Sequence, residues 1–121
     1  MKYVLGIDQG TTGSKAILVD ERLNVVGEST LNFEQYYPQP GWVEHTADEI
    51  WTTVQKTINQ VIGDHDPKDI IAIGITNQRE TTVIWDRRTG EPIYNAIVWQ
   101  SRQTVDICDE IKDRGLEPTI R

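Results

Sequence analysis

Three short apolar segments separated by two tight turns at the start of the chain constrain its fold most strongly. The segments are residues 3–7, 14–19 and 25–31, and the turns are residues 9–13 and 20–24. Apolar runs of this length that are bounded by turn residues are typical of β-strands. Because parallel strands need a long crossover connection, turns this short predict a three-stranded antiparallel meander.

The sequence after residue 45 predicts a helix. Thr46 and Glu49 match a capping box, in which each of the two side chains accepts a hydrogen bond from a backbone amide at the helix start. Apolar residues then recur at helical spacing up to Gly63, namely Ile50, Trp51, Val54, Ile58, Val61 and Ile62. We expect this apolar stripe to pack on the sheet.

A second group of strands is predicted after this helix. Residues 70–76 are nearly all apolar, as in a strand buried on both faces, and the preceding helix indicates a crossover to a parallel strand. Shorter strands are expected at residues 81–85 and 96–99. A last helix, capped by Ser101, ends at Gly115, with Val105, Cys108 and Ile111 on a side that also packs on the sheet. The fold class is therefore α/β, a mixed sheet with flanking helices.

Composition excludes several classes of protein. The net charge of −7 and the lack of a basic stripe argue against a partner that is duplex nucleic acid. No apolar run approaches the roughly 20 residues of a membrane span, and residues 1–8 do not resemble a signal peptide. The single cysteine, Cys108, predicts a reducing, cytoplasmic location, and we expect it to be a buried, inert thiol.

The turn between the first two predicted strands carries the residue types that bind phosphate. Glycines let a phosphate approach the backbone, hydroxyls donate hydrogen bonds, and a lysine adds positive charge. The residues concerned are Gly10, Thr11, Thr12, Gly13, Ser14 and Lys15. Asp8 ends a strand that we expect to be buried, where its carboxylate can hold a hydrated Mg²⁺ ion beside phosphates. The alternative is a polar hairpin whose glycines serve only the turn geometry.

This turn is not a Walker A loop. That motif has Gly-Lys followed by Ser or Thr and connects a strand to a helix. Here the order is Gly13-Ser14-Lys15, and the turn connects two strands. The predicted phosphate loop therefore belongs to a β-hairpin class.

Four polar residues, 77–80, follow the apolar strand at 70–76. Polar side chains at the end of such a strand often line a ligand crevice in α/β sheets. Arg79 offers several fixed donors and Glu80 offers acceptors, so the pair can grip a molecule with adjacent hydroxyl groups. A salt-bridged surface turn is the alternative. For His45, nearby, we expect a role in a loop or a helix cap.

Four segments together resemble the FGGY carbohydrate kinases, and within that family the glycerol kinases. They are Asp8-Gln9-Gly10-Thr11-Thr12, Pro40-Gly41-Trp42-Val43-Glu44-His45, Gly74-Ile75-Thr76-Asn77-Gln78-Arg79-Glu80-Thr81 and Asn95-Ala96-Ile97-Val98-Trp99-Gln100. The resemblance covers essentially the whole chain. The hairpin alone is shared with actin and heat-shock chaperones, whereas the run around Arg79 together with the Trp99 segment is more specific to the glycerol branch.

The resemblance implies a ribonuclease H-like, actin-like ATPase fold and ATP-dependent phosphorylation of glycerol to sn-glycerol 3-phosphate with Mg²⁺. It also implies the role of each matching residue. Asp8 lies beside the metal, the cofactor-binding residues for ATP are Thr11, Thr12, Gly13 and Lys15, and the glycerol-binding residues are Arg79, Glu80, Trp99 and Thr11. Thr11 meets the transferring phosphate, and Trp99 packs on the carbon chain of glycerol.

The chain departs from the family in two respects. Many glycerol kinases have Ser and Arg where this sequence has Gly13 and Lys15. Family members are also several times longer, so residues 1–121 correspond to the N-terminal part of the first domain, without the second domain. The general base is then expected beyond Arg121, and no catalytic residue is assigned within the chain. We expect the isolated chain to be inactive and the full-length kinase to be a homo-oligomer.

Two other functions remain open from the sequence. One is a related FGGY kinase that acts on another sugar or polyol. The other is an actin-like or chaperone-like ATPase module that binds a protein partner, which has no need of Arg79, Glu80 and Trp99 as a polyol site. A ribonuclease H-like nuclease is disfavoured because it needs several clustered carboxylates for two metal ions, and only Asp8 is clearly placed.

Overall fold

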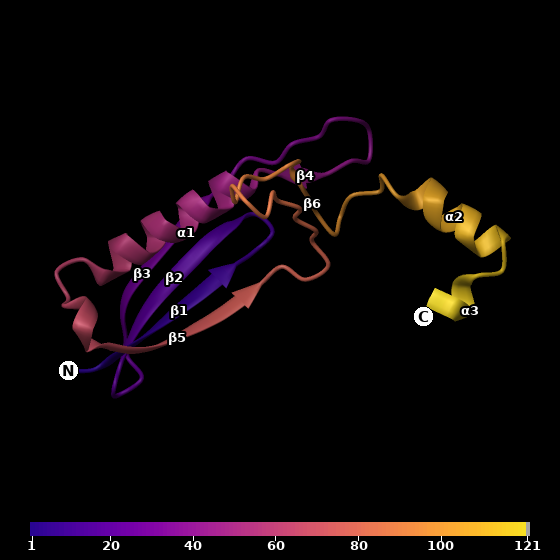
Figure 1. Ribbon diagram of the computed structural model, residues 1–121. Coiled ribbons are helices and arrows are strands. Elements are labelled where there is room, and N and C mark those ends of the chain that lie inside the picture. The colour runs from indigo at the N-terminus through magenta and orange to yellow at the C-terminus, as the bar shows by residue number, and fades with distance from the viewer. Residues whose placement is uncertain (121) are drawn as a thin grey trace.

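A computed structural model of the chain describes residues 1–120, in which a four-stranded mixed sheet carries one long helix on a single face (Figure 1). The strands lie in the order β3-β2-β1-β5. Their bounds are β1 (Tyr3–Gln9), β2 (Gly13–Asp20), β3 (Val25–Asn32) and β5 (Ile70–Asn77). The predicted antiparallel meander is confirmed, as is the parallel pairing of β5 with β1.

The strand register decides which polar residues meet at one end of the sheet. Asp8 on β1 lies opposite Lys15 on β2 and opposite Thr76 on β5. The parallel pairing of β1 with β5 places Gln9 beside Asn77, so both strands end at the same edge. The β1–β2 hairpin around residues 10–13, which we predict to bind phosphate and call the phosphate hairpin, therefore emerges beside residues 77–80.

The core lies between the sheet and helix α1 (Ala47–Ile62). Alternate residues of β1 and β2 face the helix, because successive side chains of a strand point to opposite faces. The core consists of Leu5, Ile7, Ala16 and Leu18 from the sheet and Val54 and Val61 from the helix. The predicted packing of this apolar stripe is confirmed.

The predicted capping box at the start of α1 is wrong. Thr46 occupies the N-cap position but makes no side-chain capping hydrogen bond. Glu49 instead accepts hydrogen bonds from the Tyr36 hydroxyl and, at 3.3 Å, from the backbone amide of Glu34. The loop before the helix folds back over the first turn of α1 and donates hydrogen bonds to the Glu49 carboxylate, which in a capping box would accept from the N-cap amide.

Strand β5 is exposed, although its apolar sequence predicted burial on both faces. The side chains of Ile71, Ile73 and Ile75 are 62%, 59% and 73% exposed. Helix α1 packs mainly against β2 and β3, so it does not cover β5 at the sheet edge. Within residues 1–120, β5 pairs in the sheet only with β1, and Ile70 at its start packs against the core.

The segment after β5 forms isolated pairings instead of the strand predicted at residues 81–85. Thr82 bridges to Ile97 and Trp85 bridges to Pro92, without a continuous ladder. The strand predicted at 96–99 is shorter than expected: β6 (Ala96–Ile97) pairs with β4 (Glu44–His45) in a small antiparallel sheet. This second sheet brings the Trp99 segment beside the loop that precedes α1.

The C-terminal helices project away from the sheet (Figure 1). They are α2 (Val105–Asp113) and α3 (Glu117–Ile120), and neither buries a residue. The expectation that the last helix packs on the sheet is therefore wrong, as is the buried state predicted for Cys108, which is exposed. The N-cap of α2 is Thr104 rather than Ser101.

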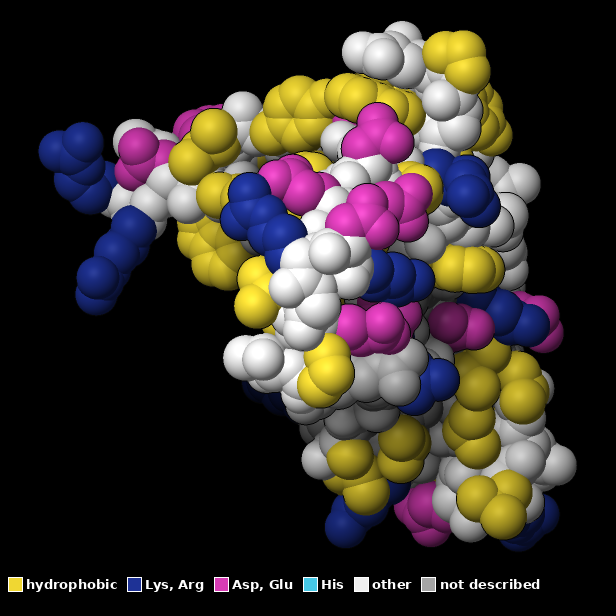
Figure 2. Space-filling view, turned by 90° about the vertical axis from the view of Figure 1, so that its right-hand side faces the viewer, with side chains coloured by type: hydrophobic (Ala, Val, Ile, Leu, Met, Phe, Trp, Pro, Cys, Tyr) yellow, Lys and Arg dark blue, Asp and Glu magenta, His cyan; other side chains and the backbone are white. Residues whose placement is uncertain are grey.

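The side of the molecule on which α2 and α3 lie has a mixed surface. Figure 2 shows acidic and basic side chains interspersed with hydrophobic ones on this face. Among the described residues, no helix has both the length and the apolar character that crossing a bilayer requires.

Candidate active site

The phosphate hairpin is closed by a hydrogen bond from the Gly10 amide to the Gly13 carbonyl, at 2.9 Å. Thr11 at its tip is half-buried and Thr12 is exposed. A Cβ atom on Gly13 would lie only 2.5 Å from the Leu31 carbonyl oxygen, closer than side chains and backbone tolerate. Glycine at this position thus allows the backbone of β3 to approach the hairpin closely. This structural role is independent of any contact with a ligand.

Two details of the hairpin differ from the sequence interpretation. The Ser14 hydroxyl does not face the loop: it is fully buried and shares a 2.9 Å hydrogen bond with the Thr53 hydroxyl of α1. The alternation of β2 directs Ser14 toward the helix and Lys15 toward the opposite face. Asp8, which we expected to be buried, is exposed on that same opposite face.

Asp8 and Lys15 border a hollow of about 610 Å³ on the face of the sheet that α1 leaves open. The Lys15 ammonium lies 2.7 Å from a carboxylate oxygen of Glu28, and its hydrogen bond with Glu28 raises the pKa of Lys15. Thr76 of β5 also lines this hollow. A carboxylate, an ammonium and a hydroxyl thus meet beside the hairpin.

The carboxylate of Asp8 fits a hydrated Mg²⁺ ion better than a metal held only by protein. Residues 1–120 contain no group of three or more His, Cys, Asp or Glu side chains that could hold a metal. Mg²⁺ usually keeps several waters and binds through one or two carboxylates together with phosphates. The exposed carboxylate of Asp8, beside the hairpin that we predict to bind phosphate, meets that requirement.

The residues predicted to bind the acceptor lie together. Arg79, Glu80 and Trp99 line one hollow of about 340 Å³. The Trp99 indole N–H donates to the Thr11 hydroxyl at 3.1 Å, which joins this hollow to the hairpin across 88 residues of sequence. Trp99 is 53% exposed, so part of its ring is free for a ligand.

Arg79 and Glu80 do not form the salt-bridged turn that was the alternative interpretation. Among the described residues, the ion pairs are Lys15 with Glu28 and Arg114 with Glu110. Glu80 has a φ of 59°, a left-handed backbone conformation that is uncommon for a residue with a side chain. Such backbone strain is concentrated at binding sites, where it aims a side chain that ordinary geometry would direct elsewhere.

A chain of polar side chains behind the hairpin was missed by the sequence analysis. Gln78 lies 3.4 Å from the Gly10 carbonyl and 3.3 Å from Nδ1 of His45. The Nε2 atom of His45 lies 2.6 Å from Gln35, whose amide donates to the Thr11 carbonyl at 3.0 Å. His45 is fully buried rather than in the loop or cap expected, and this burial lowers its pKa. No motif spacing could have indicated these contacts, since they join residues that lie far apart in the sequence.

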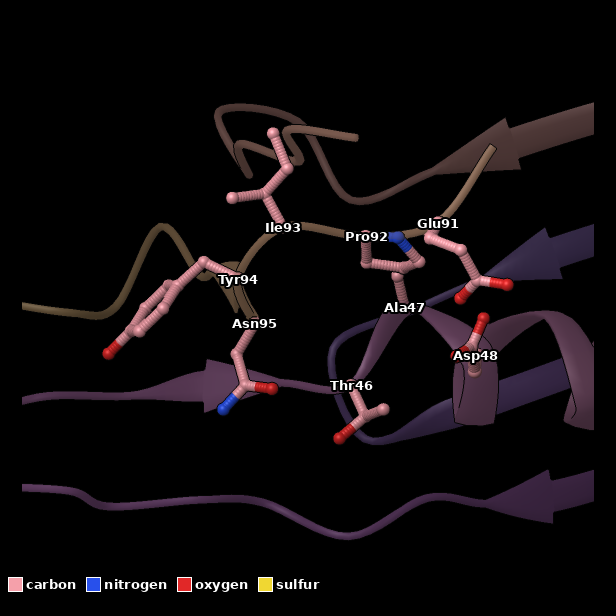
Figure 3. Close-up of a pocket in the computed structure, with 8 residues that line it drawn as sticks. All are labelled: Thr46, Ala47, Asp48, Glu91, Pro92, Ile93, Tyr94 and Asn95. Carbon is pink, nitrogen blue, oxygen red and sulfur yellow. The ribbon is translucent and has the colours of Figure 1, made fainter. Parts of the chain in front are cut away.

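A second polar cluster surrounds Glu44, which is also fully buried. Its carboxylate accepts hydrogen bonds from the Tyr94 hydroxyl at 2.8 Å and from the side-chain amides of Asn95 and Gln103, both at 3.2 Å. The hydrogen bond to Glu44 raises the pKa of Tyr94. Figure 3 shows Tyr94 and Asn95 on the segment that passes the start of α1, where they line another hollow of about 350 Å³.

Comparison with known proteins decides the family. The model of the FGGY family of carbohydrate kinases, N-terminal domain, matches residues 3–121. The chain belongs to this family. Within the FGGY family, the glycerol kinase of Carboxydothermus hydrogenoformans is 57% identical over 122 residues, which cover 99% of this chain and 24% of that protein.

Solved FGGY structures share the fold. A crystal structure of Plasmodium falciparum glycerol kinase with ADP matches with a TM-score of 0.84 and 44% identity, over 92% of this chain and 23% of that chain. A ligand-bound xylulose kinase from Lactobacillus acidophilus matches with a TM-score of 0.90 and 27% identity, over 99% of this chain and 24% of that chain. The expected actin-like ATPase fold is thereby confirmed, and the chain spans about a quarter of the length of these relatives.

Proposed function

We propose that this chain is the N-terminal part of the first domain of a longer enzyme, which we call the complete kinase. The complete kinase transfers a phosphoryl group from ATP to glycerol and forms sn-glycerol 3-phosphate. The observation that carries the proposal is the meeting of Arg79, Glu80 and Trp99 around one hollow that touches the hairpin at Thr11. The similarity to two glycerol kinases supports the same acceptor.

The acceptor side of the site suits a small triol. The Arg79 guanidinium donates and the Glu80 carboxylate accepts, so together they can hold adjacent hydroxyl groups. The exposed part of the Trp99 ring offers an apolar wall for the C–H face. A site that hydrogen-bonds hydroxyls strongly rejects analogues that lack them, because its polar groups are then left unpaired.

On the nucleotide side, we assign the ATP phosphates to Thr11, Thr12, Gly13 and Lys15. The tip of the hairpin presents backbone and hydroxyl groups, and Lys15 adds a positive charge on the open sheet face. Asp8 would hold a hydrated Mg²⁺ ion, which when bound offsets the negative charge of the phosphates. The role of these residues is to position and screen the phosphates, since phosphoryl transfer depends on positioning and charge stabilisation.

The general base is assigned to the part of the complete kinase beyond Arg121, so we expect residues 1–121 alone to be inactive. We also assign a cytoplasmic location and a homo-oligomeric state to the complete kinase. A coupled assay of ADP release tests whether residues 1–121 alone are inactive. Glycerol-dependent ADP release by the purified 121-residue chain would contradict it.

A substrate panel tests the proposed acceptor. We expect kcat/KM of the complete kinase for glycerol to exceed that for xylulose, gluconate and other carbohydrates by at least about a hundredfold, a lower bound for a site that hydrogen-bonds the hydroxyls of its substrate. The second candidate, a related FGGY kinase for another carbohydrate, is favoured by the match to xylulose kinase. A higher kcat/KM for any other member of the panel would establish that candidate instead.

A further inference from the structure

Resting on the proposed function, we propose that the adjacent residues Glu44 and His45 of strand β4 are positioning residues for the two halves of the site. Glu44 holds the segment that carries Trp99 on the glycerol side. His45 holds the carbonyl of Thr11 in the phosphate hairpin through Gln35. Neither residue lines the Arg79–Glu80–Trp99 hollow, so each acts through others.

Strand geometry explains how two neighbours serve two different segments. Successive side chains of a strand point to opposite faces, so Glu44 and His45 reach in opposite directions from one short element. Both side chains are 0% exposed. Strand β4 is itself fixed by pairing with β6, and the Val98 amide, next to Trp99, donates to the Val43 carbonyl at 3.2 Å.

The Glu44 carboxylate joins both ends of the Trp99 segment. Tyr94 and Asn95 precede β6 and Gln103 follows Trp99, and all three donate to this one carboxylate. A buried carboxylate is costly unless it is hydrogen-bonded, and hydrogen bonds to a charged acceptor are about twice as strong as neutral ones. Glu44 therefore holds residues 94–103 as one loop and sets where the indole of Trp99 stands against Thr11.

His45 lies in the middle of a chain of hydrogen bonds in which each side chain donates to the next group. The Gln78 amide donates to Nδ1, so the neutral ring carries its proton on Nε2 and donates to Oε1 of Gln35. The Gln35 amide then donates to the Thr11 carbonyl. Through Gln35, the imidazole therefore fixes the backbone of the hairpin that we assign to ATP.

We expect substitutions of the two residues to have different kinetic effects in the complete kinase. Glu44→Gln keeps the shape but places an amide N–H against a donor, so we expect the glycerol KM to rise about tenfold, as loss of a hydrogen bond to a charged group implies. Its ATP KM should stay within about twofold of wild type. His45→Phe fills the same space without either nitrogen, and we expect its ATP KM to rise about tenfold.

Conservative and control variants separate positioning from loss of folding. A Gln side chain at position 45 still donates to Gln35, so His45→Gln should keep the ATP KM within about threefold of wild type. Gln35→Met breaks the same link from a half-buried position and should reproduce the effect of His45→Phe, even if the latter does not fold. Thr57→Val, in the α1 core and away from the site, is the matched control for a buried polar change and should leave both KM values unchanged.

The steady-state kinetics of these variants decide the inference. A rise in glycerol KM confined to Glu44→Gln, with a rise in ATP KM confined to the His45→Phe and Gln35→Met variants, supports it. Equal changes in both KM values, or changes no larger than those of Thr57→Val, overturn it. A wild-type complete kinase that does not phosphorylate glycerol would instead contradict the proposed function, so the two failures are distinguishable.

Discussion

Gly13 is confined by the backbone of β3 at the point where the hairpin enters β2. A Cβ atom there would lie 2.5 Å from the Leu31 carbonyl oxygen and 2.9 Å from Cα of Asn32. Because backbone cannot move aside as a flexible side chain does, we expect Gly13→Ala to lower the free energy of unfolding by about 1–3 kcal/mol. Urea unfolding measures the change. Gly74→Ala is the control, since nothing lies within 4 Å of its added Cβ, and an equal loss in both variants would contradict this account.

His45 gives the chain a pH-dependent contribution to stability. Burial lowers its pKa, and the opposing charge that faces it is Glu49 of α1. The folded state then binds a proton less readily than the unfolded state, whose histidine pKa is about 6.5. The contribution of His45 to the free energy of unfolding is complete above that pH, and it falls as the pH is lowered toward the folded-state pKa. We expect the urea midpoint to fall between about pH 7 and pH 5 and to fall less in His45→Gln. The same slope in both proteins would show that His45 is not responsible.

At the scale of elements, strands β2 and β5 both have apolar sequences but opposite environments. Leu18 is 0% exposed beneath α1, whereas Ile73 on β5 is 59% exposed. In the isolated chain we expect Leu18→Ala to cost about 2–5 kcal/mol of stability, through lost burial and the cavity left behind. Ile73→Ala should cost less than about 1 kcal/mol. Denaturant unfolding compares the two, and similar losses would mean that β5 is covered as the core is.

Helix α2 has little to stabilise it. It has nine residues, none of them buried, and isolated helices shorter than about 12 residues are marginal in water. Amide hydrogen exchange of the isolated chain should therefore release α2 long before α1, which has 16 residues and an apolar face in the core. Protection of α2 equal to that of α1 would contradict the arrangement in Figure 1.

The sequence predicted those elements whose signals are local. The meander followed from apolar runs and turns, and α1 followed from its apolar spacing. It did not predict that Glu49 binds Tyr36 instead of capping α1, because that contact comes from a loop 13 residues earlier. Burial of β5 was predicted from composition alone, yet burial depends on which elements cover a strand. The Glu44 and His45 clusters were missed for the same reason, since their partners are distant in sequence.

At the scale of the whole molecule, two pairings assemble the candidate site. The parallel register of β1 with β5 sets the hairpin beside Arg79 and Glu80, and the small β4–β6 sheet brings Trp99 to Thr11. The candidate site is therefore built from parts that are distant in the sequence, namely the β1–β2 hairpin, residues 79–80 and Trp99. We propose that this assembly holds glycerol next to the phosphates of ATP in the complete kinase.

The glycerol KM of the Arg79→Ala variant of the complete kinase tests that claim most directly. Loss of the guanidinium should raise the glycerol KM by at least about tenfold, as removal of charged hydrogen bonds implies, while the ATP KM stays within about twofold. Arg87→Ala, at an exposed turn after Trp85, is the matched control and should change neither value. An unchanged glycerol KM in Arg79→Ala would contradict the assignment of Arg79 to the glycerol site.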